Sequence, residues 1–122
     1  VCSWKAFYLD YAQDNRCEKG QLAHLGIFNG MKKLYNYNLP AYSCVIGLQA
    51  NMWSEWIQTP KRMEYMLFPR VIALAEKCWS SEENSDYDNF LDRLSKEYRY
   101  LDKVGVYYYD HRNFNAHPEP AK

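Results

Sequence analysis

Two short apolar runs stand out in the first half of the chain. Residues 4–9 (WKAFYL) are rich in aromatic side chains and end at Asp10, and residues 44–50 (CVIGLQA) form a continuous apolar run with β-branched members. Both lengths predict strands, and the second run is typical of a strand buried on both faces in a parallel sheet. Residues 11–30, between them, are polar and punctuated by glycine, which predicts a long loop of the kind that usually carries function.

Helical spacing governs the second half of the chain. A short helix is predicted within residues 30–37, and a longer one begins at Thr59 and Pro60, which suit the cap and the first helical position. Pro69 should kink the longer helix, which we expect to end near residue 79. Its apolar face is predicted to consist of Met63, Leu67, Val71, Leu74 and Cys78.

Another helix is predicted from Ser85, where Asp86 and Asp88 complement the positive end of the helix dipole, to a stop at Gly105. We expect residues 109–122 to form a tail whose end, HPEPAK, is mobile. The predicted buried stripe of this helix is Tyr87, Phe90, Leu91, Leu94, Tyr98 and Leu101.

The order of these elements is that of an α/β protein in which strands and helices alternate. Two buried parallel strands do not make a sheet, and no other convincing strand is present, so part of the sheet should lie outside this chain. The sequence begins at Val1 without an initiator Met, which favours a piece of a longer protein or a processed product.

Composition excludes several classes of function. Lys plus Arg equal Asp plus Glu across the 122 residues, so the chain has no net charge, which argues against a nucleic-acid partner held by phosphate contacts on a basic face. No apolar run reaches transmembrane length, and no polybasic segment suggests a membrane surface. The three histidines are isolated and no cysteine pair has CxxC spacing, so we expect neither a metal nor a cofactor.

The four cysteines leave the compartment open. Cys44 and Cys78 lie in apolar runs and are expected to be buried thiols, whereas Cys2 and Cys17 are undecided between free and bridged states. Export of the parent protein to a periplasmic, extracellular or lysosomal-type compartment therefore remains open.

The segment NMWSEW, residues 51–56, follows the second predicted strand and places Glu55 between Trp53 and Trp56. Exposing tryptophan and burying glutamate are both unfavourable, so this arrangement needs a reason. Together with FYLDY (7–11) and EYMLFPRVIALAEKCWS (64–80), it resembles the end of the catalytic barrel of β-N-acetylhexosaminidases, glycoside hydrolase family 20. YDNFLDRL and YLDKVGVYY, within 87–108, resemble the helix that closes that domain.

The resemblance implies a fold, a reaction and a set of partners. The chain would be the C-terminal portion of a (β/α)8 barrel, about the last two βα units plus a closing helix, with residues 1–108 in the barrel and 109–122 as tail. The parent would be a retaining exo-enzyme that removes terminal N-acetylglucosamine or N-acetylgalactosamine by substrate-assisted catalysis. Its partners would be these sugars, the remainder of the barrel and, for the fragment, further copies of itself.

The resemblance also assigns roles to four residues at the ends of the predicted strands. The Tyr8 hydroxyl would donate to the acetamido oxygen, Asp10 and Glu55 would accept bonds from sugar hydroxyls, and Trp53 would wall the pocket. The alternatives are a core aromatic for Tyr8, a loop or cap residue for Asp10, a solvated Glu55 and a packed Trp53.

The catalytic acid of the family belongs to an adjacent Asp-Glu pair, and this chain contains no such dipeptide. We therefore expect the isolated chain to be inactive. The competing hypothesis is a non-catalytic sugar-binding or protein-interaction module that reuses barrel elements.

Overall fold

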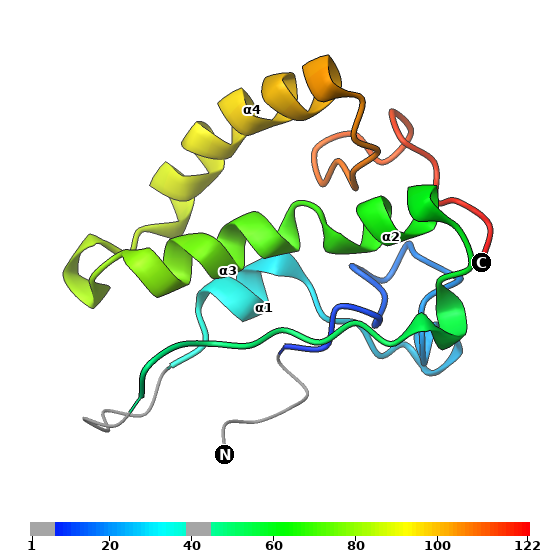
Figure 1. Cartoon of the computed structure of the whole chain (residues 1–122), viewed down its shortest axis with the longest axis horizontal. Coiled ribbons are helices and arrows are strands. Elements are labelled where there is room, and N and C mark those ends of the chain that lie inside the picture. The colour runs from blue at the N-terminus through cyan, green and yellow to red at the C-terminus, as the bar shows by residue number, and fades with distance from the viewer. Residues whose placement is uncertain (1–6, 39–44) are drawn as a thin grey trace.

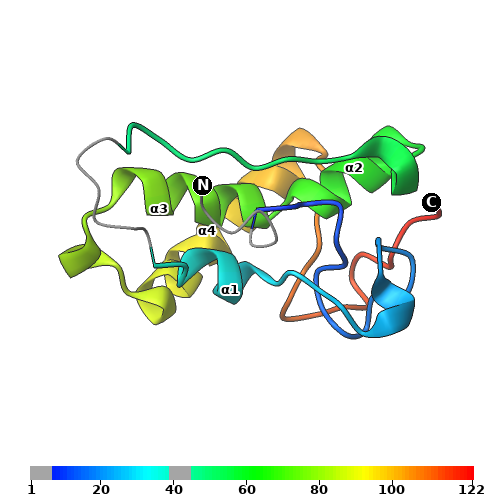
Figure 2. The same cartoon turned by 90° about the horizontal axis from the view of Figure 1, so that it is seen from below.

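The computed structural model describes residues 7–38 and 45–122 of the chain, which form a helix-rich structure (Figure 1). Helices α2 and α3 run almost end to end through the middle, with α4 above them and extended segments below them (Figures 1 and 2). The helices are α1 (Met31–Tyr35), α2 (Pro60–Leu67), α3 (Arg70–Trp79) and α4 (Tyr87–Val104), with 3-10 turns η2 (Ala23–Leu25), η3 (Ser54–Trp56) and η4 (Glu82–Asn84).

The two predicted strands meet at one parallel bridge, between Tyr8 and Asn51. The Leu9 amide donates to the Asn51 carbonyl at 2.8 Å, and the Asn51 amide donates to the Phe7 carbonyl at 2.9 Å. The segments are thus parallel neighbours, as expected, but the described residues form only isolated bridges and no strand. Residues 4–6 and 44 of the predicted strands lie outside the described residues.

The expectation that the second run is buried on both faces is wrong for this chain. Val45, Ile46 and Gly47 are exposed, and Ile46 is fully so. A strand can be buried on both faces only when elements cover both of them, and in the described chain only Leu48 and Ala50 of this run pack, partly buried, against the core.

Helices α2 and α3 replace the single kinked helix that the sequence predicts. The Thr59 hydroxyl accepts from the Arg62 amide at 3.1 Å and Pro60 opens α2, as expected. The break falls at Phe68 and Pro69, joined by a cis peptide, because proline has no amide hydrogen to continue the helix. A short α1 lies within the range predicted for it.

The predicted apolar face of this region is also wrong in part. Leu74 is buried, but Met63 is 43% exposed and Cys78 is an exposed free thiol. The break between the two helices interrupts the regular spacing on which the prediction relied. The residues that are buried are Arg62, Tyr65, Met66, Arg70, Ala73 and Leu74.

Helix α4 follows its prediction closely. The Asp86 carboxylate caps it by accepting from the Asp88 and Asn89 amides at 3.0 and 3.2 Å, so the helix begins after Asp86 rather than at Ser85. Gly105 ends it in the left-handed conformation at φ +77°, which favours glycine. Phe90, Leu94, Tyr98 and Leu101 are buried, and Tyr87 and Leu91 pack partly buried against the same core.

The C-terminal segment packs against the rest of the molecule, so the expectation of a mobile end is wrong. The Arg62 guanidinium binds the Glu119 carboxylate at 2.8 Å, and the Tyr107 hydroxyl donates to the Pro118 carbonyl at 2.6 Å. Figure 1 shows this segment beside the start of α2. Within the described residues, no helix combines the length and the hydrophobicity that crossing a membrane requires.

Candidate functional site

The bridge between Tyr8 and Asn51 brings the two predicted parts of the site together. Tyr8 contacts Trp53 edge to face, with ring centroids 6.5 Å apart and an interplanar angle of 77°. On its other side the Tyr8 ring stacks on Tyr11 at 5.9 Å. Trp53 keeps 55% of its surface exposed beside this contact, so an apolar ring face remains available to a ligand.

Asp10 lies two residues beyond Tyr8 and is fully buried. Neither carboxylate oxygen has a hydrogen-bond partner among the described residues. Loss of water raises the pKa of the Asp10 carboxyl above its ordinary value, and the nearby amides of Asp10 and Trp53 and the Arg70 charge only partly oppose this. A buried carboxylate without partners is unfavourable for the fold, which points to a role in binding.

Glu55 stands on the exposed turn η3, which begins directly after Trp53. Its negative charge makes a small contribution to the raised pKa of Asp10, so the two carboxyl groups lie near each other. The structure thus brings Tyr8, Asp10, Trp53 and Glu55 to one place. Carboxylates beside an aromatic face can accept bonds from several hydroxyl groups of one ligand while the ring packs on its apolar side.

Arg70 supports this site from beneath, a role that sequence reasoning missed. Its buried guanidinium donates to the carbonyls of Tyr11 at 2.9 Å and Asn29 at 3.0 Å, and also to those of Leu9 and Met66. Burial lowers the pKa of Arg70, yet an arginine keeps its proton in proteins.

A charged residue of a helix is usually ion-paired or solvated, whereas Arg70 binds backbone oxygens of the segment that carries Asp10. The sequence signal that could have revealed this role is a charged residue at helical spacing between two apolar ones, Met66 of α2 and Ala73 of α3, both of which are buried. Glu76, by contrast, forms an ion pair with Arg93.

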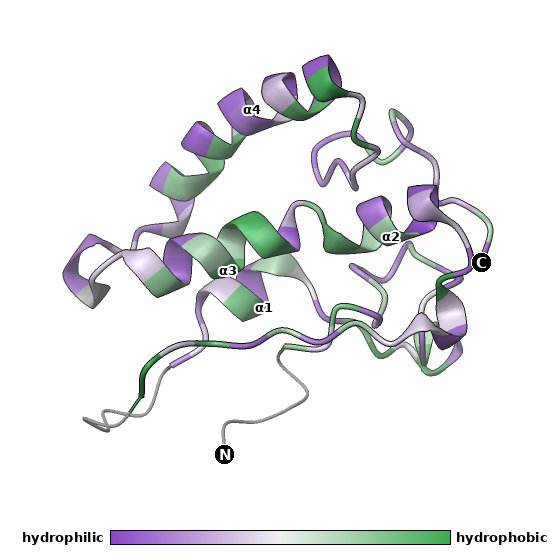
Figure 3. Ribbon diagram, in the orientation of Figure 1, coloured by the Kyte–Doolittle hydropathy of each residue, from purple (hydrophilic) through white to green (hydrophobic). Residues whose placement is uncertain are grey.

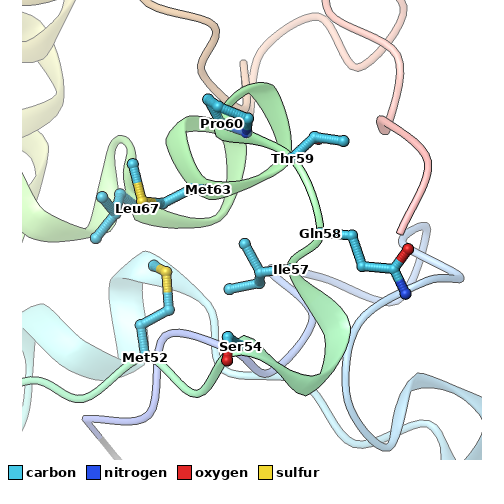
Figure 4. A pocket seen from close by; sticks show the side chains of 8 residues that line it. All are labelled: Met52, Ser54, Ile57, Gln58, Thr59, Pro60, Met63 and Leu67. Carbon is cyan, nitrogen blue, oxygen red and sulfur yellow. The ribbon is translucent and has the colours of Figure 1, made fainter.

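A separate cavity of about 460 Å³ lies on the other side of the η3 turn. Figure 4 shows Met52, Ile57, Met63 and Leu67 converging on it, while Gln58 points away. Of the site residues above, none lines this cavity, which shares only Ser54 with the η3 turn. In Figure 3 the ribbon of α2, which borders the cavity, carries both hydrophilic and hydrophobic residues.

The described residues contain no cluster of three or more His, Cys, Asp or Glu side chains that could hold a metal ion. Tyr8, Asp10, Trp53 and Glu55 offer the site a phenol, two carboxylates and an indole. Neither Asp10 nor Glu55 has an adjacent partner of the Asp-Glu type in the sequence. The arrangement suits holding a polyhydroxyl ligand.

Comparison with protein families gives one match over most of the chain. The catalytic domain of glycosyl hydrolase family 20 matches residues 1–82. A beta-hexosaminidase of Porphyromonas gingivalis is 32% identical over 109 residues, which cover 84% of this chain and 14% of that protein. N,N'-diacetylchitobiase of Vibrio harveyi is 37% identical over 67 residues, 55% of this chain and 6% of that protein.

Solved structures are similar over nearly the whole chain. An exo-β-N-acetylglucosaminidase of family 20 from Vibrio harveyi, in complex with N-acetylglucosamine, superposes with a TM-score of 0.74 at 33% identity and covers 87% of this chain and 18% of that one. A β-N-acetylhexosaminidase from Streptomyces coelicolor has a TM-score of 0.77 at 24% identity, a likeness of fold over 97% of this chain and 24% of that one. The chain thus spans only a small part of each of these relatives.

Proposed function

The chain belongs to glycosyl hydrolase family 20, and from this we propose that it is part of a retaining exo-β-N-acetylhexosaminidase and supplies part of its sugar pocket. Its fold is that of part of a (β/α)8 barrel, as the sequence predicts. The parallel bridge between Tyr8 and Asn51 fits neighbouring strands of such a barrel. Barrel enzymes place their sites where strands end, and Asp10 and Trp53 follow the two bridged segments.

The carboxylate of Asp10, buried and without a hydrogen-bond partner in the described part of the chain, carries the proposal. A terminal amino sugar offers hydroxyl groups that would satisfy Asp10 and Glu55 together, and each such charge-assisted bond is worth about 1.5–3 kcal/mol. The exposed face of Trp53 would pack on the sugar ring or on its acetamido methyl group.

In the proposed reaction the substrate's own acetamido oxygen attacks the anomeric carbon while the glycosidic oxygen leaves. The Tyr8 hydroxyl would donate to that acetamido oxygen and hold it in line with the anomeric carbon. A proton for the leaving oxygen must come from outside this chain, because the chain has no Asp-Glu pair. Water then opens the cyclised intermediate, which gives retention at the anomeric carbon.

The substitution Glu55→Gln in the full-length protein tests the proposal. It keeps the size of the side chain and removes its charge, so kcat/KM for an aryl β-N-acetylglucosaminide should fall about 10- to 100-fold. Glu97→Gln on the exposed face of α4 is the matched control and should leave kcat/KM unchanged. Unchanged kinetics in Glu55→Gln would remove this residue from the pocket.

The absence of an Asp-Glu pair from the chain favours one competing function, a sugar-binding or protein-interaction module without catalysis. The two proposals differ in what the same reading frame encodes upstream. An enzyme requires further βα units and an Asp-Glu pair there. If the upstream sequence lacks them, the hydrolase proposal fails and the non-catalytic module is the function that remains.

A further inference from the structure

The C-terminal segment 118–122 forms a junction around the carboxylate of Glu119. This carboxylate accepts from the Arg62 guanidinium at 2.8 Å and from the backbone amides of Glu18 and Lys19 at 2.7 and 3.0 Å. The Arg62 side chain has no exposed surface, and that of Glu119 is 8% exposed. One carboxylate therefore joins α2 to the loop that follows Asp10.

Backbone groups of the same segment strengthen the junction. The Lys19 ammonium donates to the Glu119 carbonyl at 3.1 Å, and the Arg62 guanidinium donates to the Pro120 carbonyl at 3.3 Å. The Nε and Nη2 atoms of Arg62 have no hydrogen-bond partner within the described part of the chain. The stability of the buried Arg62 charge thus depends on Glu119 and on the chain beside it.

The junction reaches both halves of the sugar site. On one side, Glu119 holds the loop at Glu18 and Lys19. Two residues after Lys19 the same loop is bonded to Asp10, because the Gln21 amide donates to the Asp10 carbonyl at 3.1 Å. On the other side, the Lys122 ammonium lies 3.8 Å from the centroid of the Trp56 ring, a cation–π contact with the last residue of the η3 turn.

We propose that Glu119 is a positioning residue that fixes the loop behind Asp10 relative to the turn that carries Glu55. The inference takes its sugar ligand from the proposed function. The link between the loop and the turn rests on the contacts of Glu119 and of the residues beside it. It gives a role to a segment outside residues 1–82, the range that the family match covers. Two carboxylates that clamp one sugar must keep a fixed separation, so loosening either support weakens the clamp.

The test compares Glu119→Gln with Glu76→Gln in the full-length protein. Both changes remove the acid from an ion pair with arginine, but the pair of Glu76 with Arg93 joins α3 to α4, away from the sugar site. For Glu119→Gln, KM for an aryl β-N-acetylglucosaminide should rise about fivefold while kcat stays within about twofold, because binding rather than chemistry loses its support. Glu76→Gln should change neither constant.

Hydrogen exchange measured on the same proteins supplies a readout without substrate. In Glu119→Gln, the amides of Glu18 and Lys19 and those of residues 54–57 should exchange faster, and in Glu76→Gln they should keep the wild-type rates. If Glu119→Gln does not fold, Lys122→Met tests the Trp56 side alone, with faster exchange expected at residues 54–57 and a rise in KM.

The outcomes separate this inference from the proposed function. A wild-type protein with no turnover of the glycoside overturns the proposed function, whereas the exchange rates still decide whether Glu119 couples the two segments. Equal KM values for both Glu→Gln variants, or unchanged exchange at residues 54–57 in a folded Glu119→Gln protein, overturn the positioning role.

Discussion

At the scale of single residues, Asp10 shows a conflict between folding and binding. Its buried carboxylate lacks hydrogen-bond partners among residues 7–38 and 45–122, and its pKa is raised chiefly by desolvation. Between the ordinary pKa of aspartate and this raised value, the folded chain binds more protons than the unfolded chain. Stability should therefore fall as pH rises through that window, the opposite of the usual behaviour of a paired aspartate.

The substitution Asp10→Asn should raise stability and weaken sugar binding. Above the raised pKa, the neutral amide avoids burial of an unpaired charge, so the free energy of unfolding should increase by about 1 kcal/mol. The measurement is the urea midpoint of the full-length protein as a function of pH, with Asp92→Asn on the exposed face of α4 as control. A lower midpoint at neutral pH would show that the native carboxylate is already stabilised.

Sequence motifs could predict the residues of the candidate site but not their supports. Tyr8, Asp10, Trp53 and Glu55 stand in two short motifs whose order and spacing are visible in the chain, and the structure brings them together. Arg70 and Glu119 act through contacts with residues 41 or more positions away. Only the folded structure reveals such contacts, because charged residues in a sequence are usually solvated.

At the scale of elements, predictions that rest on local signals were confirmed, whereas some that depend on tertiary cover were wrong. Caps at Thr59 and Asp86 and the stop at Gly105 depend on side chains within a few residues, so they could be predicted. The buried faces of α2 and α3 and the burial of residues 45–47 depend on what covers them. The predicted stripe is therefore exposed at its two ends, Met63 and Cys78, while Leu67 and Val71 are partly buried and Leu74 is buried.

Arg70 links α3 to the two segments that carry residues 9–11 and Asn29. In Arg70→Met, the carbonyls of Leu9, Tyr11 and Asn29 lose their donor inside the structure, and the free energy of unfolding should fall by about 3 kcal/mol or more. Denaturant unfolding of the full-length protein measures this loss. The matched control is Arg99→Met on an exposed position of α4, and equal losses in the two variants would contradict the clamp.

At the scale of the whole molecule, the chain exposes surface that a complete barrel would cover. Ile46 is fully exposed, Val45 is 39% exposed, and the apolar cavity opens between residue 52 and α2. The backbone of residues 45–50 also carries amides and carbonyls that a neighbouring strand would pair. We propose the remainder of the barrel as the natural cover for these groups, since this chain spans 6% to 24% of the relatives compared above.

The isolated chain should therefore associate with itself. An exposed strand edge beside apolar side chains is a template for pairing, and a second copy offers the same edge in return. Light scattering of the purified chain should give a mass above the 14.6 kDa of a monomer. Replacing the fully exposed Ile46 with lysine should shift the population toward monomer, whereas Tyr100→Lys on the exposed surface of α4 should not. A stable monomer in the unchanged chain would mean that these segments are covered in another way.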